Sequence, residues 1–390
     1  MRSPHSIWLI GVGQLVNWGV LYYAFGVLLV PVEEALGVAR WLVAGAFSTA
    51  LLVSAIAAPA VGRLADRGQG PVVMQAGGFI AAGLLMGWAA APTLFITYLV
   101  WTALGVCMAA ILYEPVFTIV GRAFTDNESR LRAIATVTIM GGLASTAFLP
   151  GTTYLVSALG WRGAVIALGL IIAVTTLVVS RLAFSELRFS FAQLRGAIFE
   201  AADGRIQSTP LLKRLVTIFS ISSVVNSALA SNIVAALIER QLSPARAAAI
   251  GGLFGVMQLP GRVLMTNRSF SPGPVPLLLV SFALQIAGLL ALMADRWQSA
   301  MWIGVAVFAG GAGLTTLARP YLVLHVYGSA QAGRVNGSIA RGQQLARAAG
   351  PVSAAAFASA MNGYGTAFAA MATLLAVAMI LTLAISPPSR

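Results

Sequence analysis

The amino-acid sequence predicts an all-α integral membrane protein in which twelve transmembrane helices form two pseudo-symmetric six-helix bundles. Its residues are 59% hydrophobic and only 9% charged, with a mean hydropathy of +0.88, whereas a soluble domain carries about a quarter charged residues. Apolar runs of membrane-spanning length recur along the whole chain, and parts of the first half reappear in the second. These observations exclude an ordinary soluble domain.

The predicted helices are the apolar runs themselves, because a helix crosses the hydrocarbon core with about 20 apolar residues. Short turns such as Ala91-Pro92 and 160–163 separate neighbouring runs. In chain order the twelve runs are 7–30, 41–61, 72–91, 93–120, 133–159, 163–184, 211–238, 246–266, 274–294, 298–326, 335–360 and 366–385.

The longest break in the apolar pattern divides the chain near its middle. We therefore predict an N-terminal six-helix bundle over 1–184, a cytoplasmic linker over 185–210 and a C-terminal six-helix bundle over 211–390. Aromatic and aliphatic residues in the linker alternate with charged ones, which is typical of a short helix lying on the membrane face. A disordered linker is the alternative.

A local pattern in the fourth run recurs in the tenth. Gly105 precedes the sequence Leu-Tyr-Glu-Pro at 112–115 by the same interval at which Gly310 precedes Leu-Ala-Arg-Pro at 317–320, an offset of 205 residues. Two further matches, Gly160-Trp161 with Gly363-Tyr364 and Gly62-Arg63 with Gly261-Arg262, have offsets of 203 and 199. Parallel repeats with a site at their interface are a transporter architecture.

The positive charges predict the orientation. With the N-terminus inside, cytoplasmic segments hold 15 arginine and lysine residues and outer loops hold 5, so both termini are expected in the cytoplasm. The net charge of +13 does not indicate a nucleic-acid partner, because the basic residues stand singly at the ends of apolar runs, where they meet lipid headgroups. Cys107 is the single cysteine, and we expect no disulfide, metal site or cofactor.

The loop at 62–68 reads Gly-Arg-Leu-Ala-Asp-Arg-Gly and resembles the signature loop of the major facilitator superfamily. The resemblance implies a gating role for Asp66 and Arg67, a close helix contact at Gly62, and a gating role for Arg262, the repeat mate of Arg63. The usual basic residues are absent at 69–71, where the sequence is Gln-Gly-Pro.

Two further segments, 160–162 and 333–337, resemble the bacterial branch near the monocarboxylate and oxalate/formate carriers. This resemblance implies a monomeric multi-pass protein of the bacterial inner membrane that contacts lipids and takes a small-molecule substrate.

Two charged residues at equivalent positions of the repeat are the first candidates for the site. Glu114 and Arg319 each lie within an apolar run and precede a proline, and a charge at such depth calls for a partner or a polar cavity. In the superfamily fold the first, fourth, seventh and tenth helices line the central cavity. We therefore expect Glu114 and Arg319 to face that cavity and pair reversibly, with a permanent salt bridge as the alternative.

Other candidates are arginines and neutral polar side chains. Arg347 lies deep in the eleventh run and is suited to bidentate capture of a carboxylate or phosphate, whereas Arg341 is expected to reach headgroups. The remaining substrate candidates are Gln14, Asn17 and Tyr22 on one face of the first helix, Tyr113, and Asn226 on the seventh. Packing between helices is the alternative role for these neutral groups.

These features predict a secondary transporter that moves a small organic anion, most simply a carboxylate, by alternating access, with Glu114 carrying a coupling proton. The sequence contains no phosphate-binding Gly-Lys-Ser loop and no hydrolytic constellation, so we do not expect an enzyme. One alternative is a multidrug or metabolite exporter whose cation is recognised by Glu114. Another is a membrane receptor or assembly factor that binds without translocating.

Overall fold

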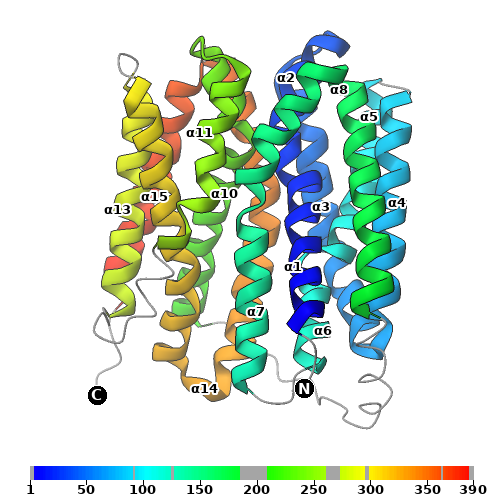
Figure 1. The fold of residues 1–390 in the computed structure, drawn as a ribbon. Helices are drawn as coiled ribbons and strands as arrows, with labels where there is room; N and C mark the ends of the chain where they lie inside the picture. The colour runs from blue at the N-terminus through cyan, green and yellow to red at the C-terminus, as the bar shows by residue number, and fades with distance from the viewer. Residues whose placement is uncertain are drawn as a thin grey trace. The chain divides into compact units, whose positions relative to one another are not determined.

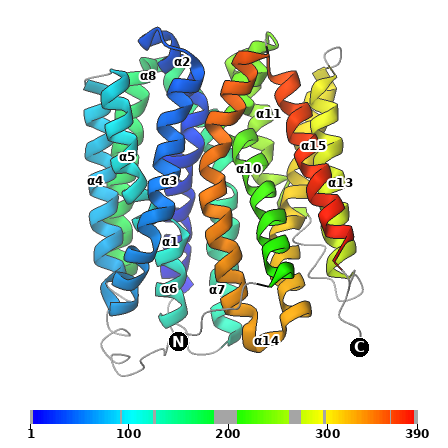
Figure 2. The same cartoon turned by 180° about the vertical axis from the view of Figure 1, so that it is seen from behind.

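The computed structural model describes residues 4–90, 93–123, 127–184, 209–260, 273–294, 298–361 and 363–385. The chain divides into two compact units, Met1–Asp203 and Gly204–Arg390. Every regular element of the described residues is helical, and in each unit the long helices run side by side (Figures 1 and 2). The expectation of an all-α fold is therefore confirmed.

The first unit contains eight α-helical segments and three π-helical turns among its described residues. In chain order they are α1 (Pro4–Trp18), η1 (Gly19–Tyr23), α2 (Ala24–Leu36), α3 (Arg40–Leu64), η2 (Ala65–Gln69), α4 (Gly70–Ala90), α5 (Leu94–Ile111), α6 (Tyr113–Ala123), α7 (Asn127–Gly142), α8 (Ala144–Val178) and η3 (Val179–Ala183).

The described part of the second unit contains α10 (Pro210–Glu239), α11 (Pro244–Val256), α13 (Pro274–Met293), α14 (Gln298–Ala360) and α15 (Tyr364–Leu383). Three of these helices begin with proline, which lacks an N–H where the first turn has no partner for one. Thr209 and Ser243 cap α10 and α11 by accepting from the N–H groups of Leu212 and Arg246. The predicted linker helix lies outside the described residues.

Eight helices of the described chain are long and apolar enough to cross a membrane. Two of them, Arg40–Ala90 and Arg132–Ala183, contain 51 and 52 residues, which is more than one crossing requires. Each holds two predicted spans joined at a glycine with positive φ, Gly68 (φ 83°) or Gly160 (φ 68°). These glycines adopt the left-handed backbone that other residues avoid, so the spans are separated without a long loop.

The tenth and eleventh predicted spans both lie within the helical stretch α14 (Gln298–Ala360), which has 63 residues. The side chains of Arg319 and Gln343 are hydrogen-bonded although 24 residues separate them, a distance of about 36 Å along a straight helix. Helix α14 must therefore fold back on itself, and its two arms meet near the label in Figure 1. The spans expected over 298–326 and 335–360 therefore lie on the two arms of α14.

Close helix contacts in each unit depend on glycine. A Cβ atom on Gly105 of α5 would collide with the carbonyl oxygen of Ala50 on α3. In the second unit, a Cβ on Gly288 of α13 would lie 2.6 Å from the carbonyl oxygen of Gly304 on α14. Backbones approach this closely in membranes because helix association there depends on close packing.

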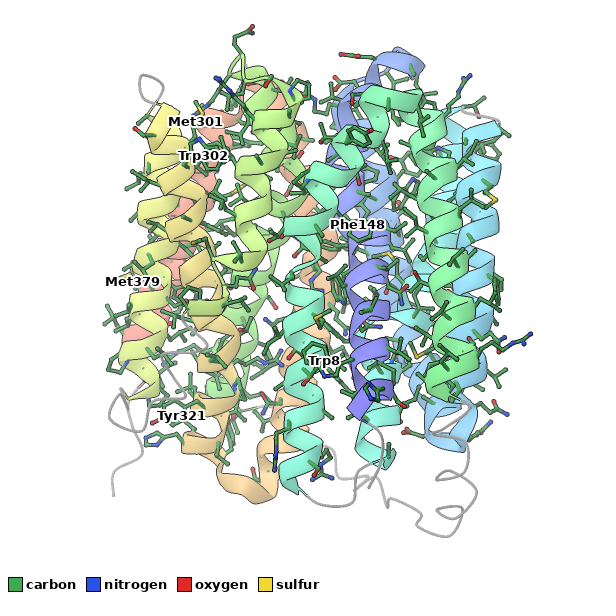
Figure 3. The ribbon with its side chains drawn as sticks, viewed as in Figure 1. Trp8, Phe148, Met301, Trp302, Tyr321 and Met379 are labelled. Carbon is green, nitrogen blue, oxygen red and sulfur yellow. The ribbon has the colours of Figure 1, made fainter. Side chains whose placement is uncertain are left out.

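Some aromatic side chains pack between helices, and others are exposed on the outside of each unit. Phe148 on α8 occupies the space that a Cβ on Gly19 would need (Figure 3). By contrast, Trp8 is 56% exposed, and Trp302 in the second unit is 42% exposed. Exposed tryptophans near helix ends are typical of the membrane interface.

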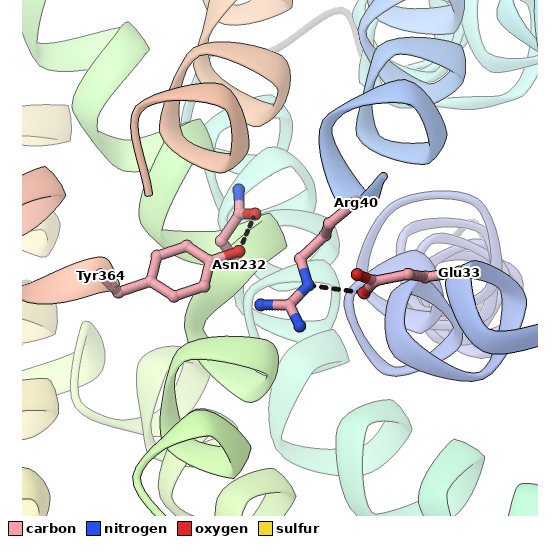
Figure 4. Close-up of polar contacts among 4 residues, drawn as sticks. All are labelled: Glu33, Arg40, Asn232 and Tyr364. Atoms are coloured by element: carbon pink, nitrogen blue, oxygen red, sulfur yellow. Dashed lines mark hydrogen bonds and ion pairs between the residues drawn. The ribbon is translucent and has the colours of Figure 1, made fainter. Parts of the chain in front are cut away.

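Polar contacts fix the connections between helices in each unit (Figure 4). In the first unit, Arg40 Nε donates to Glu33 Oε2 at 2.6 Å and closes the turn between α2 and α3. In the second unit, the buried Tyr364 hydroxyl donates to Asn232 Oδ1 at 2.9 Å and ties α15 to α10.

Replacing Gly105 with alanine is expected to destabilise the protein by about 1–3 kcal/mol, the usual cost of overpacking a core. The added methyl group would meet the Ala50 backbone, which cannot rotate away. Thermal unfolding of the purified protein in nanodiscs measures the effect.

Gly87→Ala is the matched control, because a Cβ on Gly87 of α4 meets no atom of the described residues within 4 Å. Alanine also favours the helix over glycine by about 0.5–1 kcal/mol. The control should be neutral or stabilising, and equal unfolding temperatures for both variants would contradict the assigned α3–α5 contact.

Candidate functional site

The fourth predicted span, 93–120, is interrupted at Leu112, close to Pro115. Helix α5 ends at Ile111, and α6 begins at Tyr113 after an extended residue, Leu112 (ψ −158°). Pro115 explains the break, because its nitrogen has no hydrogen and its ring clashes with the carbonyl four residues earlier. That carbonyl belongs to Ile111, which is buried.

Two side chains of α1 satisfy the carbonyl that the proline leaves without a partner. Gln14 Nε2 donates to the Ile111 oxygen at 2.7 Å, and Asn17 Nδ2 donates to the same oxygen at 3.1 Å. Both side chains are buried. An unpaired carbonyl inside a bilayer costs several kcal/mol, so these predicted substrate contacts hold α1 against the broken helix.

Aromatic rings surround the start of α6. Trp18 lies 4.9 Å from Tyr113 and 5.3 Å from Tyr22 between ring centroids, and Phe117 stacks on Tyr113 at 5.2 Å. We call these four residues the aromatic cluster. Tyr22 is buried within it, whereas Glu114, which follows Tyr113, is exposed. The cluster therefore flanks the acidic residue that the sequence predicts as a proton carrier.

In the second unit, Arg319 lies in the apolar arm of α14 over Ser299–Tyr327. Its Nη1 donates to the side-chain oxygen of Gln343 on the other arm. Its Nε is buried and has no hydrogen-bond partner among the described residues. The positive charge of Arg347 acts on Arg319, so α14 places two like charges near each other.

Neither of these arginines forms an ion pair with a described carboxylate. Arg341, on the same arm as Arg347, is exposed, which agrees with an interfacial position. Like charges repel each other, and a charge within a membrane span is costly unless it has a partner or a polar cavity. The arrangement offers N–H donors and positive charge to an anion.

Asn226 belongs to a polar network that joins three helices of the second unit. Its Nδ2 donates to the carbonyl oxygen of Ser222 at 2.8 Å and to Gln285 Oε1 at 3.2 Å. Gln285 Nε2 donates in turn to the hydroxyl of Thr315 at 3.0 Å, and Ser281 donates to the carbonyl oxygen of Gly311 at 2.9 Å. The network ties α10, α13 and α14 together, so the amide donor of Asn226 is already used within the unit.

Comparison with known proteins shows which family this helical chain belongs to. Residues 8–351 match the Major Facilitator Superfamily. The chain belongs to this superfamily. It is therefore a multi-pass membrane protein with the fold of secondary transporters, which work by alternating access, and it is not an enzyme. No curated protein sequence matches the chain.

Solved structures share the fold of this superfamily member. A bacterial homologue of the human lysosomal transporter Spinster, inward-facing and occupied, superposes with a TM-score of 0.75 at 13% identity, covering 98% of this chain and 96% of that one. The human organic anion transporter MFSD10 (TETRAN) superposes with a TM-score of 0.65 at 18% identity, covering 98% and 99%. These likenesses confirm the twelve-helix major facilitator fold.

The segment 62–68, which resembles the superfamily's signature loop, lies at the end of α3 and in η2. Asp66 and Arg67 are exposed there. A Cβ on Gly62 would meet no described atom within 4 Å, so the described residues show no close helix contact at this glycine. Arg262 lies outside the described residues. The gating roles of these residues stay predictions.

Two residues that matter for the site carried little signal in the sequence. Gln343 accepts from Arg319, and Gln285 connects Asn226 to Thr315. A glutamine within a predicted span was the available signal, since its amide must find a partner in the membrane. The partners themselves lie 24 to 59 residues away along the chain, where no local pattern indicates them.

Gln14→Leu is expected to destabilise the wild-type protein by about 1 kcal/mol, the usual net value of one hydrogen bond. The same change should cost less in a Pro115→Ala background, because the alanine restores a backbone N–H that can bond the Ile111 carbonyl. A double-mutant cycle on unfolding free energies measures this coupling.

Asn226→Leu serves as the control, since its recorded partners lie in the second unit and do not include Ile111 or Pro115. Its cost should be the same in both backgrounds. Equal costs of Gln14→Leu in the two backgrounds would show that the amide does not compensate for the proline.

Proposed function

We propose that this superfamily member transports a small organic anion, most simply a carboxylate, across the bacterial inner membrane. The observation that carries the proposal is the buried Arg319 Nε without a partner among the described residues, close to the like charge of Arg347. A guanidinium presents its donors in a planar fork that matches a carboxylate. An anion at this position would pair with Nε and offset the repulsion between the two arginines.

Gln343 fits this proposal as a neutral neighbour of the anion. Its side-chain oxygen accepts from Arg319 Nη1, and its backbone carbonyl accepts from Ser223 Oγ at 2.9 Å. The contact with Ser223 holds this turn of α14 against α10. The backbone that carries the Gln343 side chain is therefore fixed in position. Gln343 thus orients Arg319 without supplying a charge that would compete with the substrate.

The orientation proposed for the chain has both termini in the cytoplasm, with a bundle over 1–184, a cytoplasmic linker over 185–210 and a second bundle over 211–390. Its support is the excess of positive residues in the cytoplasmic segments, 15 against 5. The proposed gate uses Asp66, Arg67 and Arg262, as the resemblance of the loop implies. A kinship with monocarboxylate and oxalate/formate carriers would agree with the proposed substrate.

Carboxylates such as oxalate and lactate are expected to raise the unfolding temperature of the purified wild-type protein, because they bind only the folded state. At a concentration 100 times Kd the stabilisation is about 2.7 kcal/mol. Arg319→Gln and Arg347→Gln should each weaken this response, corresponding to a loss of about 2 kcal/mol or more in binding. A thermal-shift titration measures all three proteins.

Arg341→Gln is the matched control, because Arg341 lies on the same arm of α14 as Arg347 but is exposed. It should respond to carboxylates as the wild type does. An unchanged response in Arg319→Gln and Arg347→Gln would contradict the proposed anion site. Uptake of the stabilising anion into proteoliposomes then distinguishes a transporter from a receptor that only binds.

Glu114 is proposed to carry the coupling proton and to pair with Arg319 in part of the cycle. Glu114→Gln should abolish uptake driven by a pH gradient and preserve exchange of substrate down its own gradient, because the amide keeps the shape but cannot release a proton. Transport assays in proteoliposomes with and without a pH gradient test this. Unaltered pH-driven uptake in the variant would rule the role out.

The aromatic cluster favours a second candidate function, export of organic cations. Trp18, Tyr113 and Phe117 lie in ring contact beside Glu114, and aromatic faces attract cations. In that case tetraphenylphosphonium would stabilise the wild-type protein, and Glu114→Gln would remove the effect. Stabilisation by carboxylates alone would favour the anion transporter.

A further inference from the structure

A small cavity with several polar side chains in its lining lies among helices of the first unit, and no residue of α14 lines it. Its volume is about 20 Å³, and it is bordered by α1, α4 and the end of α8 with η3. A cavity holds a water molecule when at least about 10–15 Å³ is open to a probe of that size. The polar side chains that line it are Gln14, Asn17, Gln75, Thr175, Thr176 and Ser180.

Two of the lining groups are buried without a hydrogen-bond partner. Gln14 Oε1 and Ser180 Oγ have none among the described residues, and Gln14 is 0% exposed. The orientation of the Gln14 amide is fixed, because its Nε2 must donate to the Ile111 carbonyl. Its oxygen is therefore an acceptor that the protein leaves open at the cavity.

We propose that one ordered water molecule occupies this cavity and donates to Gln14 Oε1 while it bonds the Ser180 hydroxyl. A buried water typically makes about three hydrogen bonds to groups that otherwise have no partner. No carboxylate lines the cavity among the described residues. A bound cation would therefore keep an uncompensated charge in low dielectric, which favours a neutral occupant.

The water extends the connection that begins at the broken helix. The Ile111 carbonyl of α5 bonds Gln14 of α1, and the water joins Gln14 to Ser180. Ser180 lies in the π-helical turn η3, where the N–H of Phe184 donates to the carbonyl of Val179. A π-turn is a local irregularity that often marks a functional position. Three helices of the first unit are thus linked through one water site.

The test is a double-mutant cycle on the purified full-length protein in nanodiscs, with Gln14→Met and Ser180→Ala. Each change removes a partner of the same water, so the two losses in unfolding temperature should not add. The double variant should unfold at nearly the temperature of Gln14→Met alone. Additive losses would overturn the proposal.

Ser145→Ala is the matched control, because Ser145 Oγ is also buried without a partner among the described residues but does not line the cavity. Its effect should add to that of Gln14→Met, and non-additivity equal to that of Ser180→Ala would overturn the proposal. Sodium chloride and choline chloride at equal ionic strength should give the same unfolding temperature. Stabilisation specific to sodium and lost in Ser180→Ala would show a cation in place of the water.

A structure of the wild-type protein at a resolution that shows ordered water provides a measurement independent of variants. Density within hydrogen-bonding distance of both Gln14 Oε1 and Ser180 Oγ is expected. A dry cavity at that resolution would overturn the proposal.

Discussion

The need to pair every backbone carbonyl inside the membrane governs how each unit is built. Proline removes the hydrogen bond to the carbonyl four residues earlier, and no water in the hydrocarbon core replaces it. In the first unit Gln14 and Asn17 donate to the Ile111 carbonyl, which Pro115 leaves open. In the second unit Ser227 donates to the Arg347 carbonyl, four residues before Pro351, at 2.7 Å.

The same solution thus appears in both units, where the first long helix supplies side-chain donors to an irregular partner helix. Close approach makes it possible in the second unit, since a Cβ on Gly350 would collide with Ser227 Oγ on α10. Asn232 adds a third contact by donating to the Pro351 carbonyl at 3.2 Å. Helix α10 therefore fixes the arm of α14 that carries Arg347, and with it one of the two arginines of the proposed anion site.

Much of the fold was predictable because it depends on local properties of the sequence. The lengths of the apolar runs predicted the spans, and the repeat around Glu114 and Arg319 predicted two similar halves. The breaks in the helices were harder to predict. Pro115 indicated a kink, but the separation of α5 from α6 also depends on the donors of α1. These donors lie 97 and 94 residues from Ile111 along the chain.

The candidate site was predictable in its charges but not in its contacts. An arginine in an apolar run indicates a function because placing its charge in the membrane costs free energy. This argument made Arg319 and Arg347 candidates for the site. The neutral polar candidates on the first and seventh predicted helices were identified by residue type, but the sequence did not show their hydrogen-bond partners. In the structure the donors of Gln14, Asn17 and Asn226 serve the packing of helices, whereas Arg319 Nε has no such partner among the described residues.

The central claim is that Arg319 keeps donors available for an anionic substrate. Gln343→Glu tests it most directly, because the new carboxylate would stand where the Gln343 oxygen accepts from Arg319. The claim predicts that this variant, without ligand, unfolds at a higher temperature than the wild type and no longer responds to carboxylates. A lower unfolding temperature together with an unchanged carboxylate response would contradict it.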